Sequence, residues 1–392
     1  MKTLEHPMAD CMIIPTYWST PEQPLWKVFD HPVPVDGEGT LARTLDNLQA
    51  ISYPDPVILL PAPMDAKIVA KVRAIAAGTT IDIHILSEED LSEMTSALRD
   101  SGFPADLVGA IETASYGGIR NMGLIYAALR GFENIVMIDD DECIDGEYLK
   151  AALRHMGDIV DGVKVLGKTG CVVDENGCKV YDGQASTALE DWPKDMLFNE
   201  AVKRELDAKN SLSPCTVAFG GNMVINAGMF LRVPFDPYGT RGEDDDYVLN
   251  ARYCGLKFFF DKDLVLLHLP PKRHGDHWTR PRQDILRFKY LREKAKLFGF
   301  EPETLGVFQE YFIQDDLEYK AVSSSIKAAL QFVDTDRDEF LEFLNNATLA
   351  VSHSAGELRA KAETFVTFLQ AWQVAMPRVR GRSAPSMRKS EE

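Results

Sequence analysis

Short apolar runs alternate with helical patterns along the first half of the chain. The apolar runs include CMIIPTY at residues 11–17, PVILLPA at 56–62 and NIVMI at 134–138. Between them, residues 39–51 and 66–78 place apolar side chains at helical spacing. Repetition of strand, helix and strand predicts a mostly parallel sheet with helices on both faces. We therefore expect an α/β fold.

Polar residues follow the apolar runs directly. Thr16 and Tyr17 end the first run, Asp65 comes after the second, and Asp139 to Asp141 follow the third. Ligands of open α/β sheets bind at the carboxyl ends of the strands. We expect these polar residues to lie along one edge of the sheet.

The pattern changes in the second half of the chain. Residues 157–271 read as mixed strands and loops, which we interpret as the rest of the same domain, and helical periodicity dominates after them. The prediction is a catalytic domain over 8–300, a C-terminal helical subdomain over 301–377 and a disordered tail over 378–392. Pro377 is expected to stop the last helix.

Composition and charge narrow the possible partners. The net charge of −18 disfavours nucleic acid, and no apolar run reaches the roughly 18 residues that cross a bilayer, so we expect no integral membrane segment. The first residues lack the basic and apolar pattern of a secretory signal, which favours a soluble cytoplasmic protein. Six cysteines without a CxxC pair indicate free thiols.

Three consecutive aspartates, Asp139 to Asp141, are the strongest local signal. Neighbouring carboxylates repel one another and resist desolvation, so an apolar strand that ends in three of them needs a cation. A divalent metal supplies that charge. The alternative is a solvated acidic turn.

A family resemblance appears around this triplet. GGIRNMGLIYAALRGFENIVMIDDDE at 117–142 resembles the GT-A (Rossmann-like) glycosyltransferases, particularly family 2, which have an Arg-Asn-x-Gly helix, then a strand and a DxD motif. The resemblance implies a mixed, mostly parallel sheet flanked by helices. It also implies a donor that is a nucleotide-diphosphate sugar and a Mn²⁺ or Mg²⁺ ion.

The same resemblance assigns roles to individual residues. It implies that Asp139 contacts the nucleotide and, with Asp141, the metal, while Asp140 packs or shares the role. Arg120 and Asn121 are implied to lie near the nucleotide or its diphosphate.

The amino terminus agrees with this resemblance. MIIPTYW is similar to the first strand of the family, which implies that Pro15, Thr16 and Tyr17 border the nucleotide base. The chain departs from the family pattern in about twenty residues, 19–38, which we interpret as a lid or acceptor loop. A second departure is the absence of an acidic pair after the next strand, where Asp65 is expected to replace the base contact.

Paired glycines mark a third segment, FGGN at residues 219–222. Consecutive glycines let a backbone approach a bulky ligand closely. In GT-A enzymes an equivalent segment borders the donor sugar, so Gly220, Gly221 and Asn222 are implied to do so here. The alternative is an ordinary turn.

The segment GEDDD at 242–246 resembles the corresponding motif of β-1,4-galactosyltransferases and the acidic motif of inverting family 2 enzymes. It implies that Asp244 is the base that takes the proton of the acceptor hydroxyl, and that Glu243 binds sugar hydroxyls. Asp245 and Asp246 are expected to cap the following helix, and capping is also the alternative role for all four acids.

The stereochemistry stays open at this point. Retaining polypeptide GalNAc-transferases carry a related stretch and use no such base. Aspartate rather than asparagine at position 244 favours inversion.

Histidines follow an apolar run near residue 268. A neutral imidazole is a good Mn²⁺ ligand beside carboxylates, and His268 stands where the related galactosaminyl enzymes place their metal histidine. His274 and His277 lie in a basic loop with Arg280 that is expected to close over the diphosphate. The alternative is a solvated loop.

Together these segments predict a metal-dependent glycosyltransferase that moves a sugar to the hydroxyl of a small molecule or glycan. The alternatives are a retaining transferase, a sugar-1-phosphate nucleotidyltransferase and a non-catalytic sugar-binding protein. The first strand lacks the Gly-rich, basic signature of nucleotidyltransferases, and the intact acids argue against a non-catalytic protein. The C-terminal helices are compatible with a homo-oligomer, with acceptor binding or with support alone.

Overall fold

A single ten-stranded mixed sheet forms the centre of the protein. The computed structural model describes residues 10–21, 29, 32–179, 191–271 and 276–380. The spatial order of the main strands is β10-β12-β9-β11-β5-β1-β3-β4, with β2 beside β1 and β6 beside β12. The strands are β1 Asp10–Ser19, β2 Val33–Pro34, β3 Val57–Ala62, β4 Ile83–Ile85, β5 Asn134–Met137, β6 Glu142–Cys143, β9 Gly167–Val173, β10 Leu212–Pro214, β11 Met223–Asn226 and β12 Phe259–His268, and β7 Ile159–Val160 with β8 Val163–Lys164 forms a separate hairpin.

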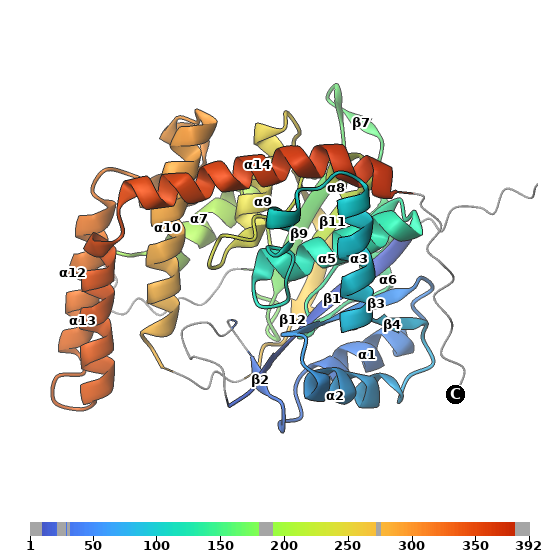
Figure 1. The fold of residues 1–392 in the computed structure, drawn as a ribbon, viewed down its shortest axis with the longest axis horizontal. Coiled ribbons are helices and arrows are strands. Elements are labelled where there is room, and N and C mark those ends of the chain that lie inside the picture. Colours follow the sequence, from blue (N-terminus) through green and yellow to red (C-terminus); the bar gives the residue numbers. More distant parts are fainter. Residues whose placement is uncertain (1–9, 22–28, 30–31, 180–190, 272–275, 381–392) are drawn as a thin grey trace, which may run out of the picture.

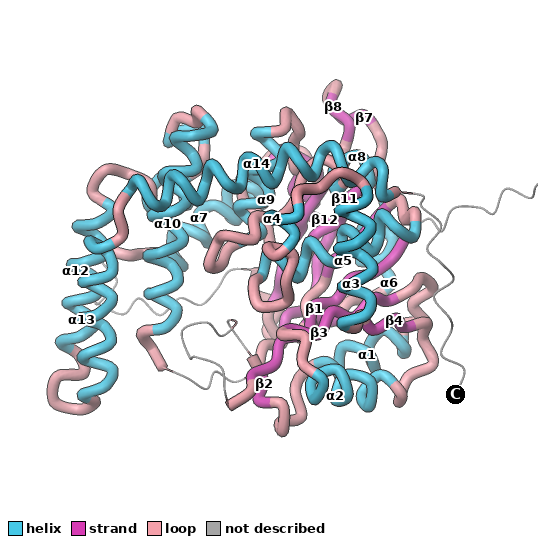
Figure 2. The backbone as a smooth tube through the Cα atoms, in the orientation of Figure 1, coloured by secondary structure: helices cyan, strands magenta, loops and turns pink. Residues whose placement is uncertain are grey.

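Helices cover the sheet. They are α1 Leu41–Ala50, α2 Ala66–Ala76, α3 Glu88–Asp100, α4 Ala105–Val108, α5 Tyr116–Arg130, α6 Gly146–Leu153, α7 Lys194–Asp207, α8 Ala227–Phe230, α9 Glu243–Tyr253, α10 Thr279–Phe298, α11 Val307–Phe312, α12 Leu317–Leu330, α13 Arg337–Ser352 and α14 Ala355–Val379. Figure 2 shows most of these helices packed around the strands, with α12 and α13 at one end of the molecule.

The amino-terminal half of the sheet is parallel. β1 pairs in parallel with both β3 and β5, and β3 pairs in parallel with β4. Residues 11–18 of β1 are all buried, as expected for a strand covered on both faces. The apolar runs of the sequence thus became the central strands, and their carboxyl ends meet at one edge.

The other half is mixed. β11 runs antiparallel to β5 and β9, whereas β12 runs parallel to β9 and antiparallel to β10. The end of β12 also pairs with β6, with His268 opposite Glu142. This last pairing places the end of β12 beside the residues that follow the aspartate triplet.

The C-terminal region is helical and returns to the sheet. α12 and α13 stand side by side at one end of the molecule, and α14 crosses from them towards α3 and α5 (Figure 1). α14 continues through Pro377 to Val379, so the expectation that Pro377 stops the helix was wrong by two residues. Proline at this position removes only one helical hydrogen bond, close to an end where helices fray.

The expected fold class is confirmed: a mixed, mostly parallel sheet flanked by helices, followed by a helical region. All six cysteines are free thiols. Within the described ranges, no helix is both long enough and apolar enough to cross a bilayer.

Candidate active site

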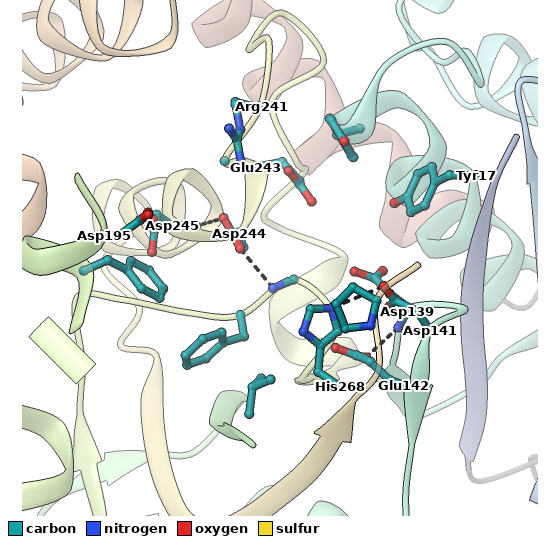
Figure 3. Close-up of a pocket in the computed structure, with 18 of the residues that line it drawn as sticks. Tyr17, Asp139, Asp141, Glu142, Asp195, Arg241, Glu243, Asp244, Asp245 and His268 are labelled. Carbon is teal, nitrogen blue, oxygen red and sulfur yellow. Dashed lines mark hydrogen bonds and ion pairs between the residues drawn. The ribbon is translucent and has the colours of Figure 1, made fainter. Parts of the chain in front are cut away.

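A cavity of about 600 Å³ opens at the edge of the sheet where the predicted residues were expected to meet. Acidic residues from the end of β5 lie on one side of it, and the first turn of α9 lies on the other (Figure 3). Of the residues predicted from the sequence, the cavity is lined by Tyr17, Arg120, Asp139, Asp140, Asp141, Gly220, Gly221, Glu243, Asp244 and His268.

Asp140 is fixed to the neighbouring elements. The hydroxyl of Thr16 donates to Asp140 Oδ2 at 2.6 Å, and the hydroxyl of Thr44 on α1 donates to the Asp140 carbonyl at 2.8 Å. Burial, with the nearby charge of Asp141, raises the pKa of Asp140 to about 8. Asp140 therefore anchors the acidic segment to β1 and α1.

Asp141 faces His268 across the cavity floor. The Oδ2 atom of Asp141 lies 3.2 Å from His268 Nε2. The pairing of β6 with β12 and a bond of 2.8 Å from the Leu269 N–H to the Asp141 carbonyl hold the two chain segments together. A histidine 127 residues away in the sequence is thereby placed beside the triplet.

Glu142 is a fourth acid of this cluster, and the sequence reading gave it no role. Its Oε2 accepts from the Asp139 N–H at 2.7 Å, and burial, followed by the charge of Asp139, raises its pKa well above the usual range. A Cβ atom at Gly221 would lie 2.2 Å from Glu142 Oε1. Position 221 must therefore be glycine to leave room for the carboxylate of Glu142. In the sequence, the position of Glu142 directly after the triplet could have indicated that it belongs to this cluster.

Arg120 connects the two sides of the cavity. Its guanidinium is 1% exposed and donates to Asp139 at 3.0 Å, to Glu243 at 2.9 Å and to the Gly220 carbonyl at 2.9 Å. Burial opposes its charge, but the carboxylates of Asp139 and Glu243 raise its pKa overall. One buried cation thus joins α5, the end of β5, the glycine segment and α9.

The first turn of α9 presents two acids to the cavity. Asp244 accepts from the Gly220 N–H at 3.0 Å and from the Asp245 N–H at 2.8 Å. Burial raises the pKa of Glu243 to about 7, although the charge of Arg120 opposes this shift. Two backbone donors orient the Asp244 carboxylate at the cavity wall.

Asp245 and Asp246 lie in the same turn but do not cap the helix, contrary to expectation. Asp245 accepts from the Ala218 N–H at 3.1 Å and pairs with Arg287 at 2.9 Å. Asp246 pairs with Lys294 at 2.8 Å. Both acids attach α9 to other segments, and their cationic partners lie too far along the chain to be inferred from local sequence.

Two solved structures have a distant similarity to this chain. No family model matches the chain, and no curated protein matches it. Among solved structures, the mannosyltransferase PcManGT from Pyrobaculum calidifontis, in complex with GDP-Man and Mn²⁺, is 15% identical with a TM-score of 0.47, over 93% of this chain and 86% of that chain. A mycobacterial protein is also 15% identical, with a TM-score of 0.41, over 75% and 76% of the two chains. At these values neither likeness carries an argument about the site.

Several predicted contact residues have other roles. Asn121 exchanges two bonds of 2.9 Å with the Phe235 backbone, and Asn222 bonds to the hydroxyl of Tyr148 at 3.0 Å and to the Cys171 carbonyl at 2.9 Å. Both asparagines are 0% exposed. Their predicted contacts with the nucleotide and the sugar are therefore corrected to roles within the core.

The predicted contacts of three more residues with the nucleotide base are corrected. Asp65 is the N-cap of α2, where it accepts from the Lys67 N–H at 2.8 Å, and it does not line the cavity. Pro15 is buried within β1, and Thr16 donates to Asp140. Of this group only Tyr17 lines the cavity.

An aromatic cluster surrounds Tyr17. The Phe29 ring lies 4.8 Å from the Tyr17 ring and 4.9 Å from the Tyr116 ring, between centroids. Phe29 belongs to the inserted loop 19–38, of which residues 22–28 and 30–31 lie outside the described part of the chain. The predicted lid stays a prediction.

The opposite wall contains residues that the sequence did not single out. α7, α10, α11 and the loop before α9 supply them: Lys194, Asp195, Phe198, Arg241, Arg287 and Phe308. Only Arg241 had a local signal, since it directly precedes the GEDDD motif. The others come from helices without recognisable motifs.

The predicted basic loop is only partly described. His274 lies outside the described residues, as do Lys272 and Arg273. The His277 ring stacks on Phe332, and the backbone N–H of His277 donates to Glu339 at 2.8 Å, so this residue belongs to the α13 side. Arg280 lines the cavity.

The donor atoms at the acidic end suit a divalent cation. Asp141 and His268 present an oxygen and a nitrogen 3.2 Å apart. Burial raises the pKa of Asp139, of Asp140 and of Glu142, which marks a site short of positive charge. The described residues gather no group of three or more metal-ligating side chains. Mg²⁺ sites commonly use only one or two protein ligands and complete the shell with substrate phosphates and water.

Proposed function

We propose that this protein is a metal-dependent glycosyltransferase that transfers a sugar from a nucleotide-diphosphate sugar to an acceptor hydroxyl with inversion. The observation that carries the proposal is the position of Arg120, which bonds both to Asp139 of the acidic strand end and to Glu243 of the GEDDD turn. These segments lie more than 100 residues apart in the sequence and meet across one cavity.

Asp141 and His268 would hold Mn²⁺ or Mg²⁺, with Asp139 at the edge of the same site. A bound cation would neutralise the diphosphate and act as a Lewis acid towards the departing nucleotide. The charges of Arg120 and His268 lower the pKa of Asp139, but burial keeps it above its usual value, so added positive charge would favour its ionised form, which supports a role for a metal here.

The aromatic cluster at the end of β1 suits the nucleotide. Tyr17 and Tyr116 line the cavity with ring centroids 5.5 Å apart, beside the acidic end. An aromatic wall stabilises a planar base by stacking. We assign the base to this wall and the diphosphate to the neighbouring carboxylates with their cation.

Asp244 is the proposed base. Its carboxylate takes the acceptor's hydroxyl proton while the acceptor oxygen forms a bond to the sugar C1 atom, and the bond from C1 to the diphosphate oxygen breaks with its electron pair leaving on the nucleotide. The N–H donors of Gly220 and Asp245 hold the carboxylate in one orientation. Glu243 lies beside it and would bind sugar hydroxyls.

A donor screen tests this function. Thermal shifts of the purified protein would be measured with UDP-, GDP- and ADP-sugars, each with Mn²⁺ and with excess chelator. We expect one nucleotide class to stabilise the protein in the presence of the metal, and the same donor to be hydrolysed slowly to free sugar and nucleoside diphosphate.

Other outcomes identify the alternatives. Release of pyrophosphate from a nucleoside triphosphate with a sugar 1-phosphate would indicate a nucleotidyltransferase. Binding without any turnover would indicate a non-catalytic protein. Product with the donor's anomeric configuration would overturn inversion and the base role of Asp244.

A further inference from the structure

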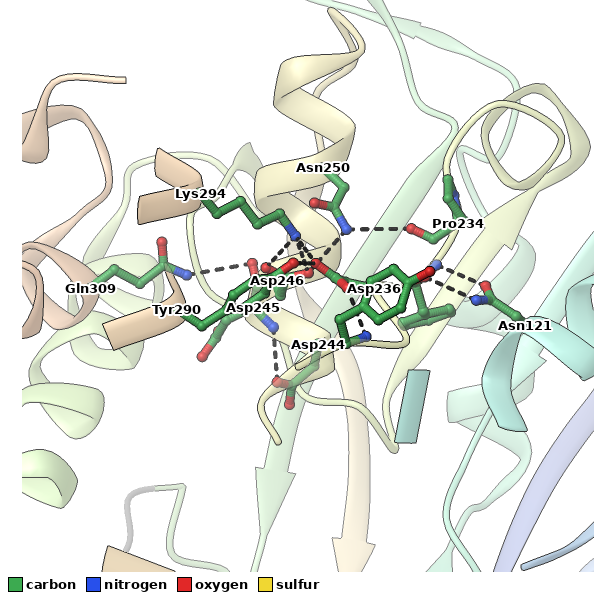
Figure 4. Close-up of polar contacts among 12 residues, drawn as sticks. Asn121, Pro234, Asp236, Asp244, Asp245, Asp246, Asn250, Tyr290, Lys294 and Gln309 are labelled. Carbon is green, nitrogen blue, oxygen red and sulfur yellow. Dashed lines mark hydrogen bonds and ion pairs between the residues drawn. The ribbon is translucent and has the colours of Figure 1, made fainter. Parts of the chain in front are cut away.

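A buried ion network lies behind the first turn of α9 (Figure 4). Asp246 is in this turn, three residues after Glu243, and does not line the cavity. The Lys294 Nζ atom lies 2.8 Å from both Asp246 carboxylate oxygens. This lysine comes from α10, so the network attaches the turn to a different helix.

Lys294 has a second carboxylate partner. Its Nζ atom is 2.6 Å from Asp236 Oδ2, and the Tyr290 hydroxyl donates to the same oxygen at 2.7 Å. The side chains of Lys294 and Asp236 are 0% and 1% exposed. The Phe365 ring of α14 lies 3.9 Å from the ammonium and helps to shield it from water. The ammonium therefore bridges a fully buried carboxylate, Asp236, and a mostly buried one, Asp246, whose side chain is 15% exposed.

The segment around Asp236 is fixed to α5. Asn121 exchanges two hydrogen bonds of 2.9 Å with the backbone of Phe235. α5 also approaches so closely that a Cβ atom at Gly117 would lie 2.2 Å from the Asp236 carbonyl oxygen. Asp236 is thus held close to α5 by the contacts of Asn121 and Gly117.

These contacts make two connections between α5 and α9. One is direct, from Arg120 to Glu243. The other runs from Asn121 through the segment at Phe235 and Asp236 to Lys294 and then to Asp246. The two connections start at neighbouring residues of α5 and end one helical turn apart on α9, so together they restrict rotation of its first turn.

We propose that Lys294 is a positioning residue, which holds the first turn of α9 so that Asp244 and Glu243 face the cavity at a fixed distance from Arg120. This inference rests on the proposed function, because it concerns the placement of the proposed base.

The burial of the bridge makes it rigid. Separating Lys294 from either carboxylate leaves an uncompensated buried charge, which is far more costly than breaking an exposed pair. Displacement of a reacting group by about 1 Å can lower a rate about 100-fold. A loose first turn should therefore slow chemistry, while the contacts proposed for the nucleotide base and the diphosphate, at the ends of β1 and β5, are kept.

The test uses the full chain, the donor identified by the screen with Mn²⁺, and donor hydrolysis as the reaction, since water serves as the acceptor. The double variant Lys294→Met, Asp246→Asn removes the bridge and leaves the net charge of the network unchanged. We expect its kcat per donor-binding site, counted by calorimetry, to fall at least tenfold while the KM for the donor stays within about twofold. The single variant Asp246→Asn should lose less, because its side-chain oxygen still accepts from Lys294.

Lys289→Met is the matched control. Lys289 is also a buried lysine of α10, 2% exposed, but its Nζ atom bonds to the Ala350 carbonyl of α13. Lys289→Met should lower the melting temperature without changing kcat per donor-binding site. If the role of Lys294 were merely structural, its variants would show this same pattern.

The outcomes separate the two proposals. An active wild type whose bridge variants keep their kcat would overturn the role of Lys294 alone. An inactive wild type would overturn the proposed function, and this inference with it. If the double variant does not fold, Asp246→Ala removes the contact between Lys294 and α9, and unchanged kcat in that variant would contradict the proposal.

Discussion

Arg120 bonds to three segments that the sequence presents as separate motifs. The sequence identified the arginine, the triplet and the GEDDD acids, but local pattern does not encode which acid an arginine meets. A buried guanidinium needs compensating charge, and in the folded chain Asp139 and Glu243 provide it. Asn121, its neighbour on α5, bonds to the Phe235 backbone and serves the core.

At the scale of one residue, we predict how Asp244→Asn changes kcat and donor affinity. Asparagine keeps the shape of Asp244 and, with its single side-chain oxygen, one of the two bonds from the Gly220 and Asp245 N–H groups. It cannot take a proton at neutral pH, so we expect kcat to fall about 100-fold or more. Donor affinity, measured by calorimetry, should change less than about threefold. The control is Asp338→Asn, in the first turn of α13 and remote from the cavity. Full turnover in Asp244→Asn would remove its role as base.

The pairing of strands and the point at which a helix starts determine where several site residues lie. β12 ends beside β6, and this pairing sets His268 against Asp141. Gly242, the N-cap residue just before α9, has a φ of +70°, in the left-handed region that favours glycine. The sequence predicted a strand before His268 and a helix after GEDDD, but not their partners.

At the scale of one element, we predict how substitutions in α14 change the free energy of unfolding. Trp372 is 0% exposed, packs with the main core and donates to the Phe230 carbonyl at 2.9 Å. Trp372→Ala should lower the free energy of unfolding by about 3–5 kcal/mol, as for other buried aromatic residues. Val374→Ala, on the same helix and 50% exposed, should change it by less than about 0.5 kcal/mol. Urea unfolding measures both.

The same experiment tests the predicted boundary near residue 300. If α14 unfolds with the sheet, Trp372→Ala will shift a single transition followed by fluorescence and circular dichroism alike. A shift confined to one of two transitions would instead support an independent C-terminal subdomain.

At the scale of the whole molecule, buried carboxylates make stability depend on pH. Burial raises the pKa of Glu205 to about 7, whereas hydrogen bonding to Arg292 lowers the pKa of Glu318 to about 2. The raised group favours folding when protonated, so its contribution falls as pH rises from about 4.5 to 7. The lowered group stabilises the fold when ionised, and that contribution is lost as pH falls from about 4.5 to 2.

Glu205→Gln tests the first half of this dependence. The variant avoids burying a charge, so it should stabilise the protein by on the order of 1–3 kcal/mol at pH 8 and by much less at pH 4.5. Glu200→Gln, on the same helix with a 45% exposed side chain, serves as the control and should behave alike at both pH values. Equal effects of Glu205→Gln at pH 4.5 and 8 would contradict the prediction.

The sequence alone determined the fold class and the approximate site, because apolar periodicity sets strand and helix and because the carboxyl ends of parallel strands share one edge. It thereby placed Tyr17 and the aspartate triplet at one edge of the sheet, whereas Asp244, which lines the same cavity, was predicted from the resemblance of GEDDD to a family motif. Only the tertiary structure decided which predicted residues face that cavity and which, like Asn222 and Asp65, serve the core or a helix cap. It also decided the partners of Arg120 and Lys294, because the compensation of a buried charge depends on segments far apart in the chain.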